Sequence, residues 1–309
     1  MITHPFQRIL GAAALGAALL ASAAAMAADA VRVGSKIDTE GRLLGSIILQ
    51  VLDANGITTE NKLQLGPTKI VRSAILAGEI DIYPEYTGNG AFFFNIDTDP
   101  AWKNAKAGYD KVKQLDEAQN KIIWLQPAPA NNTWALAVRQ EIADSNSLKT
   151  LEDFGKWVNG GGAVKLAASA EFVESPAALP AFQTTYGFKL KQDQIITLAG
   201  GDTAATIRAA AEQTSGVNTA MVYGTDGAIA SVGLVVLEDS KGAQIVYEPA
   251  ATIRADVLAK HPKIKEALEP VFASLDLKTL QELNSRIAVD GEDPQAVAAD
   301  YLKQKGFLK

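Results

Sequence analysis

The chain has 309 residues, 48% hydrophobic and 21% charged, a composition typical of a globular protein with room for two domains of about 100–200 residues each. Its formal net charge of -6 excludes a protein that wraps nucleic acid with a basic face. The absence of cysteine excludes disulfides, thiolate metal sites, thiol catalysis and a lipid-modified N-terminal cysteine.

Residues 1–27 have the pattern of a signal peptide. Arg8 supplies a positive charge, residues 9–20 form an apolar run rich in Ala and Leu, and Ala25-Met26-Ala27 is a small-x-small cleavage signal. The apolar run is shorter than the roughly 20 residues that a membrane-spanning helix needs, and polar sequence follows it directly. We therefore expect cleavage after Ala27 and a mature protein that is free in a bacterial periplasm.

The mature chain opens with alternating strand and helix patterns. In order, we expect a strand at 31–34, a helix at 40–52, a strand at 63–65, a helix at 70–75 and a strand at 80–83. The helices follow from apolar residues spaced three and four apart, with Gly56 and Gly78 placed to end them. Pro84 is expected to end the third strand because proline cannot donate to a sheet. This alternation predicts parallel sheets with helices on both faces.

A Pro/Ala/Asn-rich stretch at 126–132 separates this unit from a second one. There we expect a helix at 148–158, a strand at 164–167, a helix opened by Ser175-Pro176, a strand at 195–198, a helix at 203–213 capped by Asp202 and a strand at 217–223. Strand-like runs at 234–237 and 244–247 then lead to helices at 263–274, 277–287 and 294–304.

The order of these elements predicts an α/β fold of two lobes joined by crossover strands, with a ligand cleft between them. Lobe 1 is expected to comprise residues 28–130 and 245–309, and lobe 2 residues 131–244. Ligands of open α/β sheets bind beyond the carboxyl ends of the strands. The residues at those strand ends are therefore the candidates for a site.

Aromatic residues stand beside turn residues at four strand ends or crossovers. They lie in the segments 83–90, 131–134, 223–227 and 247–249. Each of them taken alone also fits simple packing beside a turn. Together they fit a cage for a quaternary ammonium group, which has no N–H donor but is attracted by the faces of Trp and Tyr, by roughly 0.5–2 kcal/mol per ring. Such a cage needs rings from distant parts of the chain, as a cleft between two lobes provides.

Several motifs together resemble a known family of receptors. They are Gly34-Ser35-Lys36 with Thr39-Glu40, the run from Asp81 to Gly88, the run from Asn131 to Leu136, and the run from Tyr223 to Gly227. The chain resembles the glycine betaine/carnitine/choline-binding proteins of osmoprotectant ABC importers, and most of all the periplasmic branch of Gram-negative bacteria. The resemblance extends over essentially the whole mature chain. It implies a type II periplasmic binding protein that closes on its ligand and docks on a membrane permease.

In that family four aromatic residues surround the trimethylammonium group. The resemblance places them here at Tyr86, Trp134, Tyr223 and Tyr247. Trp134 stands where the family has a tyrosine, whereas the spacing from Tyr223 to Tyr247 agrees with the family's pair.

The carboxylate end of the ligand matches the family less well. Relatives commonly have Gln after the Thr-Glu pair and Thr or Asp three residues after the first cage tyrosine, where this chain has Gly41 and Asn89. The Asn89 amide can still donate a hydrogen bond, and backbone N–H groups near Gly41 are placed to hold an anion. The differences concern affinity and ligand choice, not the class of protein.

An enzyme on a similar scaffold, such as a secreted hydrolase, is one alternative. It is disfavoured because His4 lies in the leader and His261 is followed by a proline, which leaves acid–base chemistry without its commonest residue. Glu85 and Glu174 are conceivable as a carboxylate pair of the glycosidase kind. We expect no catalytic residues, no metal and no cofactor.

A receptor of the same fold for an amino acid or an oxyanion is the other alternative. Such sites usually carry an arginine clamp, for which Arg42 and Arg72 lie close enough in sequence to the first lobe's loops. The expected partners are a small betaine-like molecule and the permease of an ABC importer, with no nucleic acid, and the protein is expected to be a monomer.

Overall fold

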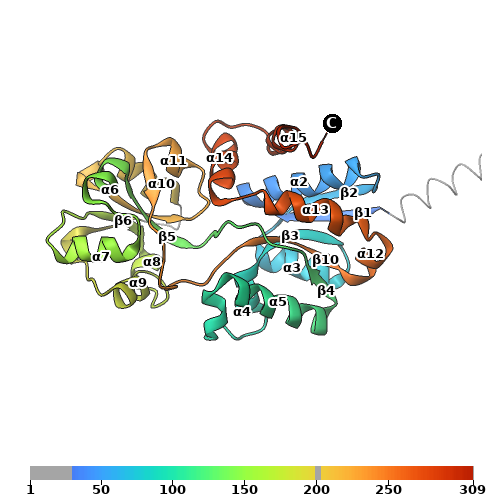
Figure 1. Cartoon of the computed structure of the whole chain (residues 1–309), viewed down its shortest axis with the longest axis horizontal. Helices are drawn as coiled ribbons and strands as arrows, with labels where there is room; N and C mark the ends of the chain where they lie inside the picture. Colours follow the sequence, from blue (N-terminus) through green and yellow to red (C-terminus); the bar gives the residue numbers. More distant parts are fainter. Residues whose placement is uncertain (1–29, 199–202, 309) are drawn as a thin grey trace, which may run out of the picture.

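The structure is a computed structural model that describes residues 30–198 and 203–308. It has two lobes, each built around a five-stranded sheet covered by helices (Figure 1). The predicted two-lobed α/β fold is thus confirmed, whereas the predicted signal peptide and Asp202 lie outside the described residues. Within the described residues, no helix has the length and apolar character needed to cross a membrane.

The sheet of lobe 1 joins strands from both ends of the chain, in the order β2-β1-β3-β10-β4. Its strands are β1 (Val31–Lys36), β2 (Thr59–Gly66), β3 (Ile82–Tyr86), β4 (Ile122–Trp124) and β10 (Pro249–Arg254). β1 is parallel to β2 and β3, whereas β10 runs antiparallel to both β3 and β4.

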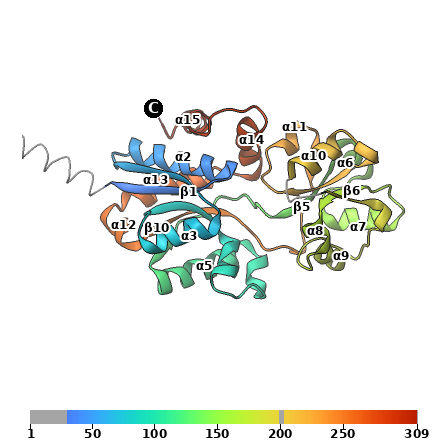
Figure 2. The ribbon, with the colours of Figure 1, turned by 180° about the vertical axis from the view of Figure 1, so that it is seen from behind.

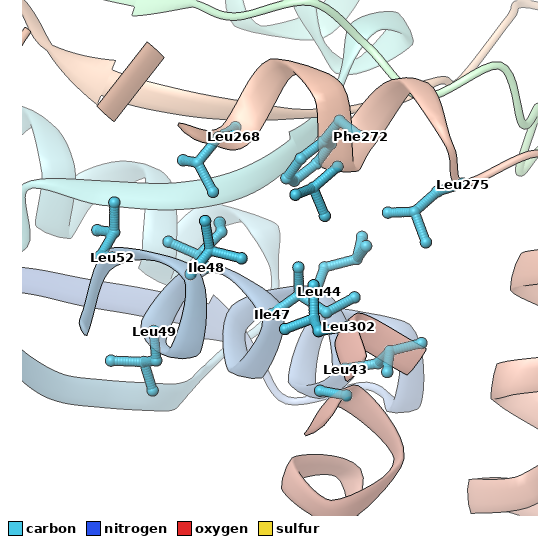
Figure 3. Packing of buried hydrophobic residues seen from close by; sticks show 14 of the residues in the cluster. Leu43, Leu44, Ile47, Ile48, Leu49, Leu52, Leu268, Phe272, Leu275 and Leu302 are labelled. Carbon is cyan, nitrogen blue, oxygen red and sulfur yellow. The ribbon is translucent and has the colours of Figure 1, made fainter. Parts of the chain in front are cut away.

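Helices cover both faces of this sheet. One face carries α2 (Thr39–Ala54), α13 (Lys263–Ala273), α14 (Leu277–Ala288) and α15 (Pro294–Gln304); the other carries α3 (Thr68–Ala77), α4 (Gly90–Phe93) and α5 (Ala105–Asn120), and α12 (Ala255–Lys260) follows β10. Apolar residues of α2 such as Leu44 and Ile48 are fully buried against Phe272 of α13 and Leu302 of α15 (Figure 3). The three predicted C-terminal helices are confirmed within a residue or two.

Lobe 2 has the strand order β7-β6-β8-β5-β9. Its strands are β5 (Trp134–Arg139), β6 (Leu166–Ser169), β7 (Ile195–Leu198), β8 (Thr219–Tyr223) and β9 (Leu234–Val236), and its helices are α6 (Gln140–Asn146), α7 (Leu151–Asn159), α8 (Ala170–Glu174), α9 (Leu179–Tyr186), α10 (Thr203–Ala211) and α11 (Ala228–Ser231). β6 is parallel to β7 and β8, and β5 is antiparallel to β8 and β9. Short 3-10 turns occur at Thr87–Asn89, Pro100–Lys103, Gln192–Gln194 and Thr214–Gly216.

Helix α14 of lobe 1 is in direct contact with lobe 2, beside α11 (Figure 2). Gln281 donates from Nε2 to the Gly224 carbonyl at 2.7 Å, and Asn284 donates from Nδ2 to the Thr225 carbonyl at 2.9 Å. Gly227 allows the close approach, because a Cβ there would lie 2.2 Å from the Ser285 backbone nitrogen. The loop after β8 is therefore held against lobe 1.

Several predicted elements differ from the structure: the strand at 63–65 extends over Thr59–Gly66, the helix at 203–213 ends at Ala211, and three further differences have a clear cause. β3 runs through Pro84, because β10 pairs with it at Ala251 while β1 pairs with β3 only at Ile82. The run 244–247 is not a strand. Its backbone hydrogen bonds are formed with residues of separate segments, including Trp102 and Asn132, rather than with one neighbouring strand. Ser175 ends α8 instead of opening α9, which begins at Leu179.

Candidate ligand-binding site

A cavity of about 1040 Å³ is lined by residues of both lobes. Lobe 1 contributes Tyr86 and Asn89, lobe 2 contributes Trp134 and Tyr223, and the crossover into β10 contributes Tyr247. The structure thus brings together in one cavity all five residues that the sequence analysis singled out.

Trp134 and Tyr223 form a pair at the edge of the lobe 2 sheet. They are direct cross-strand partners, at the start of β5 and the end of β8. Their rings stack with centroids 6.4 Å apart and 23° between the planes, and Phe172 packs edge-on against the indole from behind at 5.9 Å. Cross-strand aromatic pairing of this kind fixes both rings relative to the sheet.

Tyr86 and Tyr247 come from the lobe 1 side of the cavity. Tyr86 is the last residue of β3 and lies opposite Pro249 at the start of β10. The Tyr247 backbone N–H donates to Asn131 Oδ1 at 2.8 Å, which ties the two crossover segments together. A Cβ at position 88 would lie 2.7 Å from Cδ1 of Tyr247, so the glycine there lets the ring pack on the chain.

The cavity tyrosines remain un-ionised at neutral pH. Burial raises the pKa of Tyr247 to about 12, and it raises the pKa of Tyr86 and Tyr223 as well. Phenolate chemistry is therefore absent near neutrality. These residues offer neutral ring faces and hydroxyl groups to whatever occupies the cavity.

Glu85 lies beneath the cavity wall and organises its polar groups. Its carboxylate accepts hydrogen bonds from Lys36 Nζ at 2.5 Å, from Tyr83 at 3.0 Å and from Asn89 Nδ2 at 2.7 Å. The Lys36 ammonium also sits 4.4 Å from the centroid of the Tyr86 ring. The donor group of Asn89 that we expected near a ligand carboxylate is thus used by Glu85 in this conformation.

The start of α2 is also satisfied from within the protein. Asp38 is the N-cap of this helix, and its carboxylate accepts the Gly41 N–H at 2.7 Å. This amide is therefore not available to an anionic ligand group in this conformation.

A buried glutamate that the sequence did not single out as a site residue also lines the cavity. Glu40, in the first turn of α2, accepts hydrogen bonds from the Tyr86 hydroxyl and from Asn284 Nδ2, both at 2.7 Å, and a longer one of 3.3 Å from Asn132. Burial is the main reason that its pKa is raised. One feature of the sequence could have indicated a buried polar partner: Asn284 is an amide on the otherwise apolar buried face of α14.

Groups required by the two alternatives lie elsewhere. Arg72 forms a two-pronged ion pair with Asp116, and Arg42 lines a separate cavity of about 160 Å³, so neither reaches the main cavity. Glu174 does not line the main cavity either, and Glu85 is paired with a lysine. Within the described part of the chain, no cluster of three or more Asp, Glu or His residues is placed to hold a metal ion.

Comparisons with known proteins point in one direction. The model of the OpuAC family, "Substrate binding domain of ABC-type glycine betaine transport system", matches residues 29–304. The glycine betaine-binding protein YehZ of Escherichia coli K12 is 62% identical over 283 residues, which cover 92% of this chain and 93% of that protein. A glycine-betaine-binding protein of Pseudomonas aeruginosa is 32% identical over 307 residues, covering 97% and 96%.

Solved structures agree with these matches. The structure of apo YehZ from Escherichia coli, 62% identical, superposes with a TM-score of 0.87 and covers 90% of this chain and 99% of its own. The crystal structure of a glycine betaine/carnitine/choline ABC transporter protein superposes with a TM-score of 0.80, covering 90% and 100%. Since its identity is 20%, this second match supports the fold alone.

Proposed function

Because the chain belongs to the OpuAC family, the substrate-binding domains of ABC-type glycine betaine transport systems, we propose that it captures glycine betaine or a similar quaternary-ammonium osmolyte in the cavity between its lobes. Family membership makes it a transport protein rather than an enzyme, with an ABC importer as its partner. The observation that carries the choice of ligand is the convergence of four aromatic residues, from both lobes and a crossover, on one cavity.

The charge of the lining favours a cation. Six charged residues line the cavity within the described chain, four acidic and two basic: Asp38, Glu40, Asp97, Asp226, Lys36 and Lys103. A trimethylammonium group surrounded by Tyr86, Trp134, Tyr223 and Tyr247 gains roughly 0.5–2 kcal/mol per ring once water is excluded. The excess of acidic groups adds longer-range attraction for the same charge.

The division of the cage between lobes provides a signal. Tyr86 belongs to lobe 1 whereas Trp134 and Tyr223 belong to lobe 2, so a ligand that touches all of them favours a closed arrangement. The permease then distinguishes loaded from empty protein by shape. Asn89 remains our proposed contact for the ligand carboxylate, and to make that contact its amide has to exchange Glu85 for the ligand.

Proteins of this kind work in the periplasm, and we propose that residues 1–27 are the leader that directs export, removed after Ala27. We also propose that the mature protein is a monomer. We propose in addition that lobe 1 comprises residues 28–130 and 245–309 and that lobe 2 comprises residues 131–244.

Isothermal titration calorimetry of the mature chain, from Ala28 onward, tests the function. The protein is first unfolded and refolded to remove any ligand carried over from the cell, and is then titrated with glycine betaine, choline, carnitine, proline and sulfate. We expect saturable binding of at least one trimethylammonium compound and none of sulfate or proline. Binding of proline or sulfate alone would replace the proposal with the amino acid or oxyanion receptor.

A further inference from the structure

Two buried carboxylates flank Tyr86, and their charges are balanced differently. Glu85 is fully buried and forms an ion pair with Lys36 at 2.5 Å. Glu40 is 5% exposed, but the groups that hydrogen-bond to it are all uncharged, namely the side chains of Thr225, Tyr86, Asn132 and Asn284. Across residues 30–198 and 203–308, no lysine, arginine or histidine forms an ion pair with Glu40.

The charged neighbours of Glu40 do not supply the missing countercharge. Asp38, two residues before it, is itself acidic and raises the pKa of Glu40 further, and Asp226 lines the cavity from the lobe 2 loop. Lys36 on β1 is the basic group on this side, and it is engaged by Glu85. Crossover residue Asn132 and α14 residue Asn284 contribute amides only. The positive end of the α2 dipole compensates part of the charge and no more.

A buried carboxylate without a cationic partner is unstable in its ionised form. Because Glu40 lines the ligand cavity, a cation bound there stabilises the ionised form of its carboxylate. Tyr86 links Glu40 to the cavity, since its hydroxyl donates to Glu40 and its side chain is part of the lining in which we place the cation. A phenol that donates to a carboxylate gains electron density in its ring, which strengthens the attraction of that ring for a cation.

We propose that Glu40 is the charge-selecting residue of the cavity, and that its ionised carboxylate acts as the countercharge of the ligand's cationic group. This inference rests on the proposed function, because it requires a cationic ligand in this cavity. In this view Glu40 makes the cavity selective for a cation over a neutral molecule of the same shape, a distinction to which the aromatic rings alone contribute little.

The inference has a thermodynamic consequence. A cation binds the ionised form of Glu40 more tightly than the protonated form, so binding lowers the pKa of this carboxyl group and releases a proton. Affinity for a permanently charged ligand therefore falls as the pH drops below the pKa of Glu40 in the empty protein, by up to about tenfold per pH unit. Burial raises that pKa, which moves the effect toward neutrality.

The test compares wild type with Glu40→Gln by calorimetry with glycine betaine, from about pH 4, near the ordinary pKa of a glutamate, to about pH 8, in pairs of buffers with different heats of ionisation. The ligand's own carboxylate stays ionised throughout this range. For wild type we expect affinity to fall as the pH is lowered and protons to be released on binding. For Glu40→Gln we expect binding weakened roughly 10- to 100-fold, independent of pH and without proton release.

A second pair of ligands isolates the charge. Choline and its uncharged carbon analogue 3,3-dimethyl-1-butanol have nearly the same shape, and we expect wild type to prefer choline. Glu40→Gln should lose most of that preference. Equal preference in the two proteins would overturn the inference.

Two control variants separate charge from positioning. Tyr86→Phe removes the hydroxyl donor but keeps the ring and the Glu40 charge, so it should weaken binding while proton release persists. Glu248→Gln alters a partly buried carboxyl with a raised pKa that does not line the cavity, and it should keep the wild-type pH dependence.

The outcomes for the inference and for the proposed function are distinct. If wild type binds no trimethylammonium compound, the proposed function fails. If wild type binds glycine betaine with no pH dependence and no proton release, the function stands and the role of Glu40 is wrong. This wild-type measurement decides the matter even if Glu40→Gln does not fold.

Discussion

The rings of Trp134 and Tyr223 stack across strands β5 and β8 with their centroids 6.4 Å apart. We predict that replacing both by Ala abolishes glycine betaine binding in calorimetry, because the lobe 2 half of the cage is removed. The fold should persist, since both side chains are part-exposed at the cavity rather than in the core. Circular dichroism and a thermal melt check this.

Trp157→Ala serves as the matched control for that double variant. Trp157 is a half-buried tryptophan of the same lobe that packs on Phe154 and does not line the cavity. We expect it to lower stability but to leave affinity unchanged. A double cage variant that keeps wild-type affinity would rule out the cage.

Gly227→Ala tests the contact between the loop after β8 and α14. An added Cβ would lie 2.2 Å from the Ser285 nitrogen and 2.4 Å from the Asn284 carbonyl carbon, so backbone has to move. We expect a loss of about 1–3 kcal/mol in the free energy of unfolding, measured with urea, together with weaker ligand binding.

Gly108→Ala in α5 is the matching change at a site with space. Its added Cβ would have no contact shorter than 3.4 Å, and alanine favours a helix by up to about 1 kcal/mol over glycine. It should be neutral or stabilising. If both glycine variants behave alike, steric contact with α14 is not the cause.

Glu248→Gln should raise stability at neutral pH. Burial raises the pKa of Glu248 in the folded state, so the folded protein holds this proton more tightly than the unfolded chain does. The ionisable side chain therefore costs stability as the pH rises from about 4.3, its unfolded value, through its folded pKa. The difference in Tm between variant and wild type is expected to grow from about pH 4 to neutrality and then level off. A difference that does not vary with pH would refute this.

Leu44→Ala tests the core beneath α2. Leu44 is fully buried among residues of α13 and α15, and we expect a loss of about 2–5 kcal/mol in the free energy of unfolding. Leu76→Ala, at a leucine that is 48% exposed, should change it by about 0.5 kcal/mol or less. Similar losses in the two variants would show that this cluster does not determine stability.

Local sequence was sufficient for elements whose signals are local. The C-terminal helices were placed closely because apolar residues recur at helical spacing and because Asp293 and Pro294 mark the start of the last one. β10 was missed because it begins with Pro249 and its residues are nearly all buried, so no alternation is visible. Its pairing with β3 and β4 is a long-range property.

The site divides in the same way. Turn residues at strand ends pointed to four segments that carry aromatic residues, and the family resemblance then placed the cage at Tyr86, Trp134, Tyr223 and Tyr247. The polar contacts were not found, because Glu40 and Asn284 are 244 positions apart in sequence and meet only once α14 packs on lobe 1. Likewise, nothing in the sequence around Asn89 indicates that Glu85 accepts its amide hydrogen. The predicted lobe boundaries remain a prediction. One sheet takes its strands from before residue 130 and after residue 245, and the other takes all of its strands from between them.

The place of β10 in the sheet also bears on the order in which the lobes assemble. β10 lies between β3 and β4, and in the described sheet β4 has no other neighbour. Residues 122–124 therefore stay unpaired until residues 249–254 have emerged, whereas every strand of lobe 2 falls between residues 134 and 236. In a chain that crosses a membrane from its N-terminus, lobe 2 can complete its sheet while lobe 1 is still half made. We therefore expect lobe 1 to close after lobe 2, because non-local strand pairing is formed slowly.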